Sequence, residues 1–222
     1  MTINRYLIKI YSAKTLAELI SNTKLIQRGL RDMGVWPEIE ELLNKIRTMY
    51  EKGLLKECVD VCEEILKTNP DHFLTLCYYG RCLYALSRFA EAIKTLTKCL
   101  AIENSLYFLW LYRGDCYFKQ RRYPEAFADY QRAIDLNPNS GVSWDSAAQA
   151  LFLTKKTKKA IEYIERAIAL QPKNPVPMIR KAQFYEYSGD TKEAYFMYCA
   201  ARAIFPTNKY ILQKVKKLSA TG

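Results

Sequence analysis

The fold is decided by residues 110–138, which read WLYRGDCYFKQRRYPEAFADYQRAIDLNP. In this stretch Trp110, Gly114 and Tyr117 are separated by four and then three residues. This spacing places the three side chains on one face of a helix. A catalytic motif would gather polar groups, whereas this pattern spaces apolar and small groups over successive helical turns. The stretch therefore predicts a helix that packs against another helix.

A second helix is predicted after the turn QRRYP. Pro124 stands where this helix would begin, a position at which its missing N–H has no hydrogen bond to lose. Ala126, Tyr130 and Ala133 share one face of the helix. Pro138 cannot continue a helix and so ends the unit. Because each helix carries a small residue on its packing face, the two helices can approach closely, with aromatic side chains filling the surrounding space.

The same pattern recurs along the chain with a period of 34 residues. Residues equivalent to Ala126 are Cys58, Ala92, Ala160 and Ala194. Residues equivalent to Pro138 are Pro70, Pro172 and Pro206, with Asn104 as the exception. A fixed repeat of this length indicates stacked helix–turn–helix units that bury a continuous core only when they stack.

This pattern resembles the tetratricopeptide repeat family over residues 39–206. The resemblance implies an all-α, right-handed superhelical α-solenoid of antiparallel helix pairs. It implies five units at approximately 39–72, 73–106, 107–140, 141–174 and 175–208. Residues 209–222 are predicted to form a capping helix and tail, and residues 1–38 a helical N-terminal extension. The first unit departs most from the pattern, because Ile46 stands at its small-residue position.

The composition argues against an enzyme and against a bound cofactor or metal. The chain of 222 residues has one histidine, His72, which falls in a turn between repeats, and no glycine-rich phosphate loop. Among its seven cysteines, Cys58, Cys62 and Cys99 occupy core positions, where a free cysteine serves as a small apolar residue. An odd cysteine count without a secretory leader predicts an intracellular, cytoplasmic protein. No apolar run is long enough for a transmembrane segment.

In the resembled family, positions 2, 5, 9 and 12 of each unit line a concave groove that binds partner proteins. Carried onto this sequence, these positions predict a groove lined by Arg47, Tyr50, Leu74, Arg81, Tyr84, Phe108, Leu111, Asp115, Phe118 and Phe152. The set is apolar and aromatic, and such contiguous patches usually mark binding sites. We therefore expect a scaffold or adaptor that holds a peptide or helix with apolar anchors, with an acidic residue available to pair with Arg81.

The family's clamp for a chaperone C-terminal carboxylate is disfavoured. Leu43, Arg47, Phe108 and Tyr112 stand where that clamp requires Lys, Asn, Lys and Arg. An alternative function is contact with RNA or another polyanion, because the net charge is +11. Candidate contacts in the basic turns are Arg121, Arg122, Lys155, Lys156, Lys158 and Lys159.

Residues 1–38 leave three alternatives open. The segment LAELISNTKLIQRGL is amphipathic at helical spacing and could fill the groove, or it could cap the solenoid. The first 34 residues also hold six Lys/Arg against two acidic residues, a composition similar to that of a mitochondrial presequence.

Overall fold

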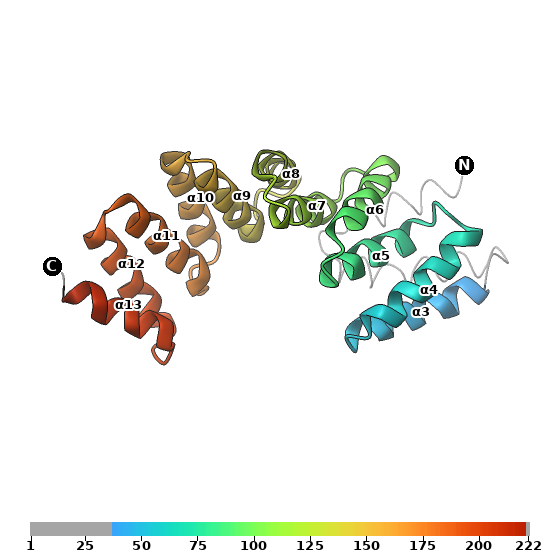
Figure 1. The fold of residues 1–222 in the computed structure, drawn as a ribbon, viewed down its shortest axis with the longest axis horizontal. Helices are drawn as coiled ribbons and strands as arrows, with labels where there is room; N and C mark the ends of the chain where they lie inside the picture. Colours follow the sequence, from blue (N-terminus) through green and yellow to red (C-terminus); the bar gives the residue numbers. More distant parts are fainter. Residues whose placement is uncertain (1–36, 221–222) are drawn as a thin grey trace. The chain divides into compact units, whose positions relative to one another are not determined.

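The computed structural model describes residues 37–220, and this part of the chain consists of eleven α-helices and contains no strand (Figure 1). Predictions for residues 1–36 lie outside the described residues. The chain divides into two compact units, Met1–Arg122 and Tyr123–Gly222. The prediction of an all-α repeat solenoid is confirmed, since each unit is a stack of consecutive helices joined by short turns.

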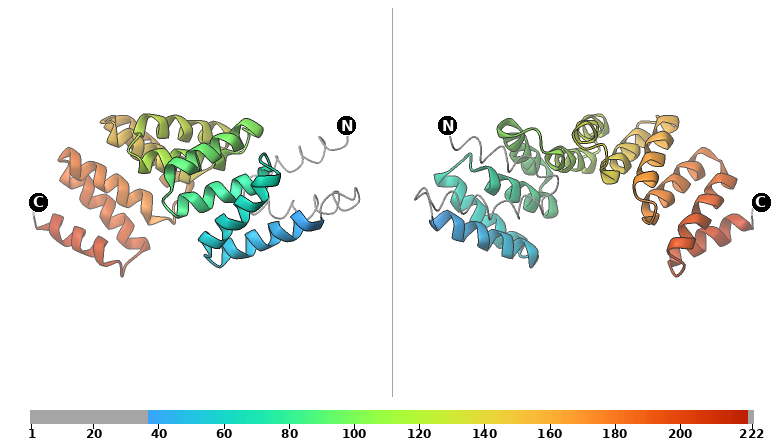
Figure 2. Two further views of the ribbon diagram at one scale, coloured as in Figure 1. Left: turned by 45° about the vertical axis from the view of Figure 1, so that its right-hand side comes forward. Right: turned by 180° about the vertical axis from the view of Figure 1, so that it is seen from behind.

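The first unit contains five described helices. They are α3 (Pro37–Glu51), α4 (Leu55–Thr68), α5 (Phe73–Ala85), α6 (Phe89–Ile102) and α7 (Tyr107–Lys119). Consecutive helices pack side by side, and α5 also contacts both α3 and α7 (Figure 2). The first helices of three successive repeats therefore lie next to one another within this unit.

The second unit contains six helices. They are α8 (Tyr123–Leu136), α9 (Gly141–Leu153), α10 (Thr157–Leu170), α11 (Pro175–Ser188), α12 (Thr191–Ile204) and α13 (Lys209–Ser219). Each helix packs against the next, and α13 covers α12 with the buried side chains Ile211, Val215 and Leu218.

Small residues allow the helices of a pair to approach closely. Ala92, Ala160 and Ala194 are fully buried at the equivalent positions of α6, α10 and α12. On α5, a Cβ added to Gly80 would lie 3.0 Å from Cδ2 of Leu96 and 3.1 Å from its Cγ. This distance is shorter than ordinary van der Waals contact, so only glycine fits without a shift of α5 or of Leu96.

The turn inside each described repeat has one residue in the left-handed region. These residues recur every 34 positions, with φ of 73° at Gly53, 61° at Ser87, Arg121 and Lys155, and 86° at Gly189. Each donates its N–H to the carbonyl three residues earlier, as Lys155 does to Phe152 at 2.9 Å. The N–H of the residue that follows each of them donates to the carbonyl five residues earlier. The first helix of each of these repeats therefore ends in a Schellman-type cap.

Two tryptophans form hydrogen bonds with backbone carbonyls in the turns between repeats. The indole Nε1–H of Trp110 donates to the carbonyl of Asn104 at 2.8 Å. Trp144, 34 residues later, donates in the same way to the carbonyl of Pro138 at 2.8 Å. Each bond joins the first turn of α7 or α9 to the segment that precedes the helix.

Candidate functional site

An arginine enclosed by tyrosine rings occupies the contact between α3, α5 and α7. Arg81 of α5 is only 8% exposed. Its guanidinium carbon lies 4.3 Å from the ring centroid of Tyr50 on α3, 5.4 Å from that of Tyr112 on α7 and 5.9 Å from that of Tyr78 on α5. These distances are within the range of cation–π attraction. We call these four residues the Arg81 cluster.

The guanidinium of this cluster lacks the hydrogen bonds that a buried cation normally has. Nε and Nη1 of Arg81 are both buried and have no hydrogen-bond partner in the described part of the chain. Aromatic faces compensate only part of the cost of removing these donors from water. Burial raises the pKa of Tyr50, although the charge of Arg81 acts in the opposite direction. The Tyr50 hydroxyl is therefore protonated at neutral pH and can donate a hydrogen bond.

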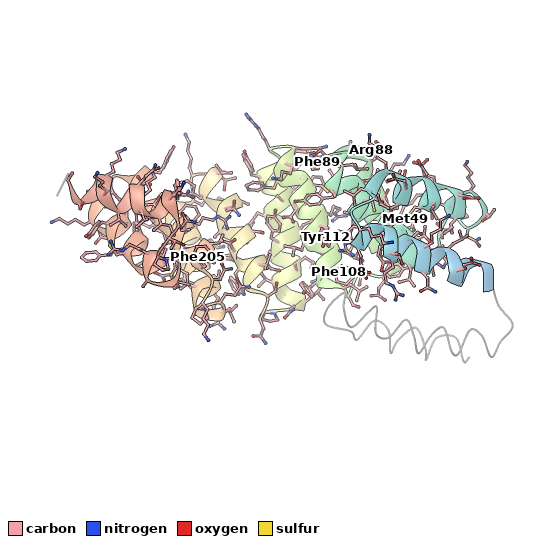
Figure 3. All side chains as sticks on the ribbon, turned by 90° about the horizontal axis from the view of Figure 1, so that it is seen from below. Met49, Arg88, Phe89, Phe108, Tyr112 and Phe205 are labelled. Carbon is pink, nitrogen blue, oxygen red and sulfur yellow. The ribbon has the colours of Figure 1, made fainter. Side chains whose placement is uncertain are left out.

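Tyr84 extends the aromatic surface from the cluster toward the C-terminal end of α5. Its ring centroid lies 6.0 Å from that of Tyr112 and 5.9 Å from that of Phe89. Burial raises the pKa of Tyr84 to about 12, with a smaller contribution from Asp115. Tyr84 is half-buried, so part of its side chain is available for contact. Figure 3 labels Phe89 and Tyr112 among the side chains of this unit.

Two members of the cluster were not among the residues predicted from the sequence. Tyr78 and Tyr112 lie 34 residues apart and so occupy the same repeat position. This recurrence of tyrosine was a signal that could have found them. Of the predicted groove residues, the structure brings Tyr50, Arg81 and Tyr84 together with these two tyrosines.

The other predicted groove residues of the first unit differ in exposure. Phe108 is buried in the hydrophobic core of this unit, with its ring 6.1 Å from that of Tyr107. Arg47 is half-buried and donates to the side chain of Asn44 at 3.1 Å. The remaining members are half-buried: Leu74, Leu111, Asp115 and Phe118.

In the second unit, Phe152 at the end of α9 packs against aromatic residues of α11. Its ring stacks on that of Phe184 with centroids 4.2 Å apart and planes 14° apart, and it meets Tyr187 edge-on at 5.1 Å. Tyr187 is 75% exposed. An ion pair between Asp145 of α9 and Arg180 of α11 joins the same two helices. Phe152 therefore contributes both to packing within this unit and to an aromatic surface that Tyr187 continues.

The predicted basic residues lie on the surface of the turns. Arg121 and Arg122 are exposed, and the guanidinium carbon of Arg122 lies 4.4 Å from the ring centroid of Tyr117. Lys155, Lys156, Lys158 and Lys159 are also exposed. None of these four lysines forms an ion pair with a described carboxylate. They form a cluster of uncompensated positive charge at the start of α10.

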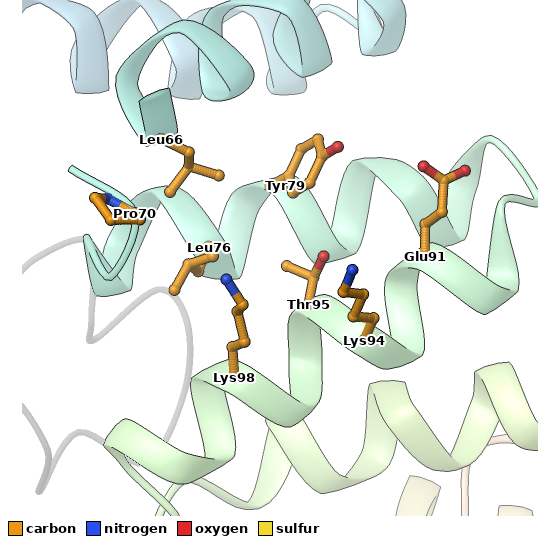
Figure 4. A pocket seen from close by; sticks show the side chains of 8 residues that line it. All are labelled: Leu66, Pro70, Leu76, Tyr79, Glu91, Lys94, Thr95 and Lys98. Atoms are coloured by element: carbon orange, nitrogen blue, oxygen red, sulfur yellow. The ribbon is translucent and has the colours of Figure 1, made fainter. Parts of the chain in front are cut away.

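A pocket of about 260 Å³ lies between α4, α5 and α6 (Figure 4). Its apolar lining includes Leu66, Leu76 and part of Tyr79, and Lys94 and Lys98 contribute ammonium groups. Leu76 and Tyr79 lie on a different face of α5 from Arg81 by helical spacing.

Among the described residues, no group of three or more His, Cys, Asp or Glu side chains could hold a metal ion. No helix within residues 37–220 has the length and apolar character needed to span a membrane.

This arrangement of helix pairs defines a helical-repeat protein, and comparison with known proteins identifies the repeat. Two models of the tetratricopeptide repeat match residues 107–140 and 142–174. The resemblance to the tetratricopeptide repeat family is thus confirmed for the third and fourth units. No curated protein matches the sequence.

Solved structures with this fold resemble most of the chain at low sequence identity. MamA from Desulfovibrio magneticus RS-1 is 15% identical, with 78% of this chain and 98% of that chain covered and a TM-score of 0.73. YrrB, a TPR protein with an unusual peptide-binding site, is 16% identical, with 86% and 97% covered and a TM-score of 0.68. A thermophilic TPR protein of Thermus thermophilus is 18% identical, with 82% and 98% covered and a TM-score of 0.64. Proteins with this fold are generally non-enzymatic interaction scaffolds.

Proposed function

We propose that this protein is a non-enzymatic scaffold that holds a partner peptide or helix against the first helices of its repeats. The observation that supports this proposal is the gathering of Tyr50, Arg81, Tyr84 and Tyr112 where α3, α5 and α7 meet. Tyrosine and arginine are the residue types that most often carry interface energy. Three of these side chains are half-buried, so they combine a fixed position with an available surface.

The test is replacement of Tyr84 and Phe118 together by alanine. Both side chains are half-buried, so the double variant should fold with nearly unchanged helicity. Each truncation should weaken partner binding by on the order of 2 kcal/mol if the side chain is an anchor in a desolvated interface. A pull-down from native lysate with mass spectrometry identifies the partner, and calorimetric titration of both proteins then measures the difference.

The control variant changes Lys155, Lys156, Lys158 and Lys159 to Glu. Under the proposal, this reversal alters the association rate and its salt dependence more than the dissociation rate. The proposal is wrong if the folded double-alanine variant binds the partner unchanged while the charge reversal abolishes binding.

A second candidate function is contact with a polyanion through the turns. The supporting observation is the cluster of four exposed lysines without ion pairs to described carboxylates at the start of α10. If a nucleic acid is the natural ligand, the logarithm of its binding constant falls steeply and linearly with the logarithm of salt concentration. The same lysine-to-glutamate variant should then remove most of that slope, and the double-alanine variant should keep it.

A further inference from the structure

The Arg81 cluster contains a charge whose partner is absent from residues 37–220. No carboxylate among these residues pairs with Arg81, and its Nε and Nη1 have no hydrogen-bond acceptor there. Two other partly buried cations of this protein form ion pairs with carboxylates: Arg180 pairs with Asp145, and Lys214 pairs with Glu186. A buried guanidinium without acceptors is destabilising unless something else satisfies it.

The geometry of the enclosure limits what the missing acceptor can be. Tyrosine rings lie around the guanidinium at centroid distances of 4.3, 5.4 and 5.9 Å, and an aromatic ring offers its N–H groups no lone pair of the kind that a carboxylate has. The N–H groups of a guanidinium lie in its own plane, so a planar two-oxygen acceptor fits them best. A carboxylate can bridge either Nη1 and Nη2 or Nε and Nη2. Both arrangements satisfy at least one of the two nitrogens that now lack a partner.

We propose that the Arg81 cluster binds the carboxylate of an aspartate or glutamate side chain in the partner peptide. This inference rests on the proposed scaffold function and names the chemistry that the partner must carry. The acidic residue enters between Tyr50 of α3 and Tyr112 of α7, which are both half-buried, and pairs with Arg81 of α5.

The charges of the molecule favour an acidic ligand at this site. The chain has a net charge of +11, which attracts acidic segments over long range. The apolar and aromatic surroundings of Arg81 strengthen the pair once the carboxylate is inside, because the local dielectric constant is low. Tyr84, whose ring lies 6.0 Å from that of Tyr112, offers an apolar contact for a neighbouring ligand residue. We therefore expect an acidic residue beside an apolar one in the bound segment.

The experiment uses a display library of random peptides, each about 12 residues long, selected against the full chain. Selected peptides should share an Asp or Glu at a constant distance from an apolar residue. Replacing that acidic residue by Asn or Gln should weaken binding to the unmodified protein at least about tenfold. The same replacement should change binding to the Arg81→Met variant less than about twofold, because the two changes remove one interaction.

Arg88→Met is the matched control. Arg88 is an exposed arginine that pairs with Glu91 outside the cluster, so its loss removes the same charge and should leave peptide affinity and acid preference unchanged. Thermal unfolding gives an independent readout. Arg81→Met replaces an unsatisfied buried cation by an apolar side chain of similar length, so the melting temperature should be equal or higher. A lowered melting temperature with unchanged peptide affinity would mean that Arg81 is only structural and would overturn the proposal.

Two further outcomes separate this inference from the proposed function. If peptides are selected and lose affinity for the Tyr84→Ala/Phe118→Ala variant, but show no acidic requirement, the scaffold function stands and the carboxylate site is wrong. If no peptide is selected, or the selected peptides bind that variant unchanged, both proposals are wrong. Displacement of the peptide by a single-stranded RNA oligonucleotide, dependent on Arg81, would assign the site to phosphate and would also overturn the inference.

Discussion

His72 shows how a single side chain can couple the fold to pH. It is the N-cap residue of α5, where its Nδ1 accepts the backbone N–H of Thr75 at 3.4 Å and lies 2.7 Å from the Thr75 hydroxyl oxygen. Accepting that N–H requires the neutral ring, and a positive charge at a helix N-terminus opposes the helix dipole. Burial lowers the pKa of His72 below its usual 6.5. The folded state therefore favours the unprotonated form.

We expect the stability contributed by His72 to be present above about pH 6.5, the unfolded pKa, and to be lost as pH falls through the folded pKa. Because the chain has one histidine, its proton NMR titration can be followed without overlap. The measured pKa should be below 6.5. His72→Asn preserves an N-cap acceptor and should flatten the dependence of melting temperature on pH between about pH 5 and pH 7. A titration midpoint at or above 6.5 would contradict this account.

At the level of the structural elements, the left-handed turn residue recurs in every described repeat but is glycine in only two of them. Ser87, Arg121 and Lys155 adopt φ of 61°, a conformation that crowds the Cβ atom of any residue other than glycine. The cap hydrogen bonds are equivalent in all five turns, so the backbone requirement is the same throughout. Three of the five turns therefore carry a small strain that the helices on either side impose.

Lys155→Gly should relieve this strain and raise the free energy of unfolding by up to about 1 kcal/mol. Part of this gain is offset because glycine increases the conformational entropy of the unfolded chain. The measurement is the urea midpoint, with the slope of the transition unchanged. Lys158→Gly is the matched control, because it removes the same exposed charge from within α10 and should cost about 0.5–1 kcal/mol. Equal effects of the two substitutions would show that charge, not backbone conformation, dominates at this turn.

The last helix is attached by a polar network as well as by its apolar face. Lys214 of α13 donates to both carboxylate oxygens of Glu186 on α11 at 2.8 Å, and the hydroxyl of Tyr198 on α12 donates to the same group at 2.6 Å. Burial alone would raise the pKa of Glu186, but the bonds from Lys214 and Tyr198 outweigh it and lower the pKa. One carboxylate thus connects the last three helices of the second unit.

Glu186→Gln should lower the melting temperature at about pH 7 and have little effect at about pH 3. A depressed carboxyl pKa stabilises the fold above the unfolded pKa of about 4.3, and this contribution is lost as pH falls through the folded value. The effect is expected to be at most about 1 kcal/mol because the pair is partly exposed. Lys214→Met should behave in the same way, whereas Lys216→Met, at an exposed lysine of α13 without an ion pair to a described carboxylate, should change nothing. A pH-independent loss would instead indicate a packing role.

For the molecule as a whole, the sequence predicts where the helices of each repeat begin, but it does not predict the side-chain contacts between neighbouring repeats. The 34-residue period places the first helices at Phe73, Tyr107, Gly141 and Pro175, and the structure begins them at these residues. Only the first differs, beginning at Pro37, two residues before the predicted unit start at Ile39. Three of these starts carry a local signal, because the side chains of His72, Ser140 and Asn174 cap α5, α9 and α11.

The Arg81 cluster could not be derived in the same way. Helical spacing places Arg81 and Tyr84 on one face of α5, but the contact with Tyr50 and Tyr112 joins residues 31 positions apart on either side. Such contacts depend on how closely one repeat stacks on the next, which repeat periodicity alone does not determine. Repeat position likewise does not tell how deeply a side chain is buried: Phe108, at a predicted groove position, lies in the hydrophobic core of the first unit.

The two tryptophan–carbonyl bonds also allow the unfolding of each unit to be followed by intrinsic tryptophan fluorescence. Trp110 belongs to the first unit and Trp144 to the second, and each indole hydrogen bond exists only while the adjoining turn is intact. Indole fluorescence shifts to longer wavelength when the ring becomes solvated. With Trp36 and one of these residues replaced by phenylalanine, the emission of the remaining tryptophan follows a single unit. Two such single-tryptophan chains can show whether the units melt together or one after the other, without any attached dye.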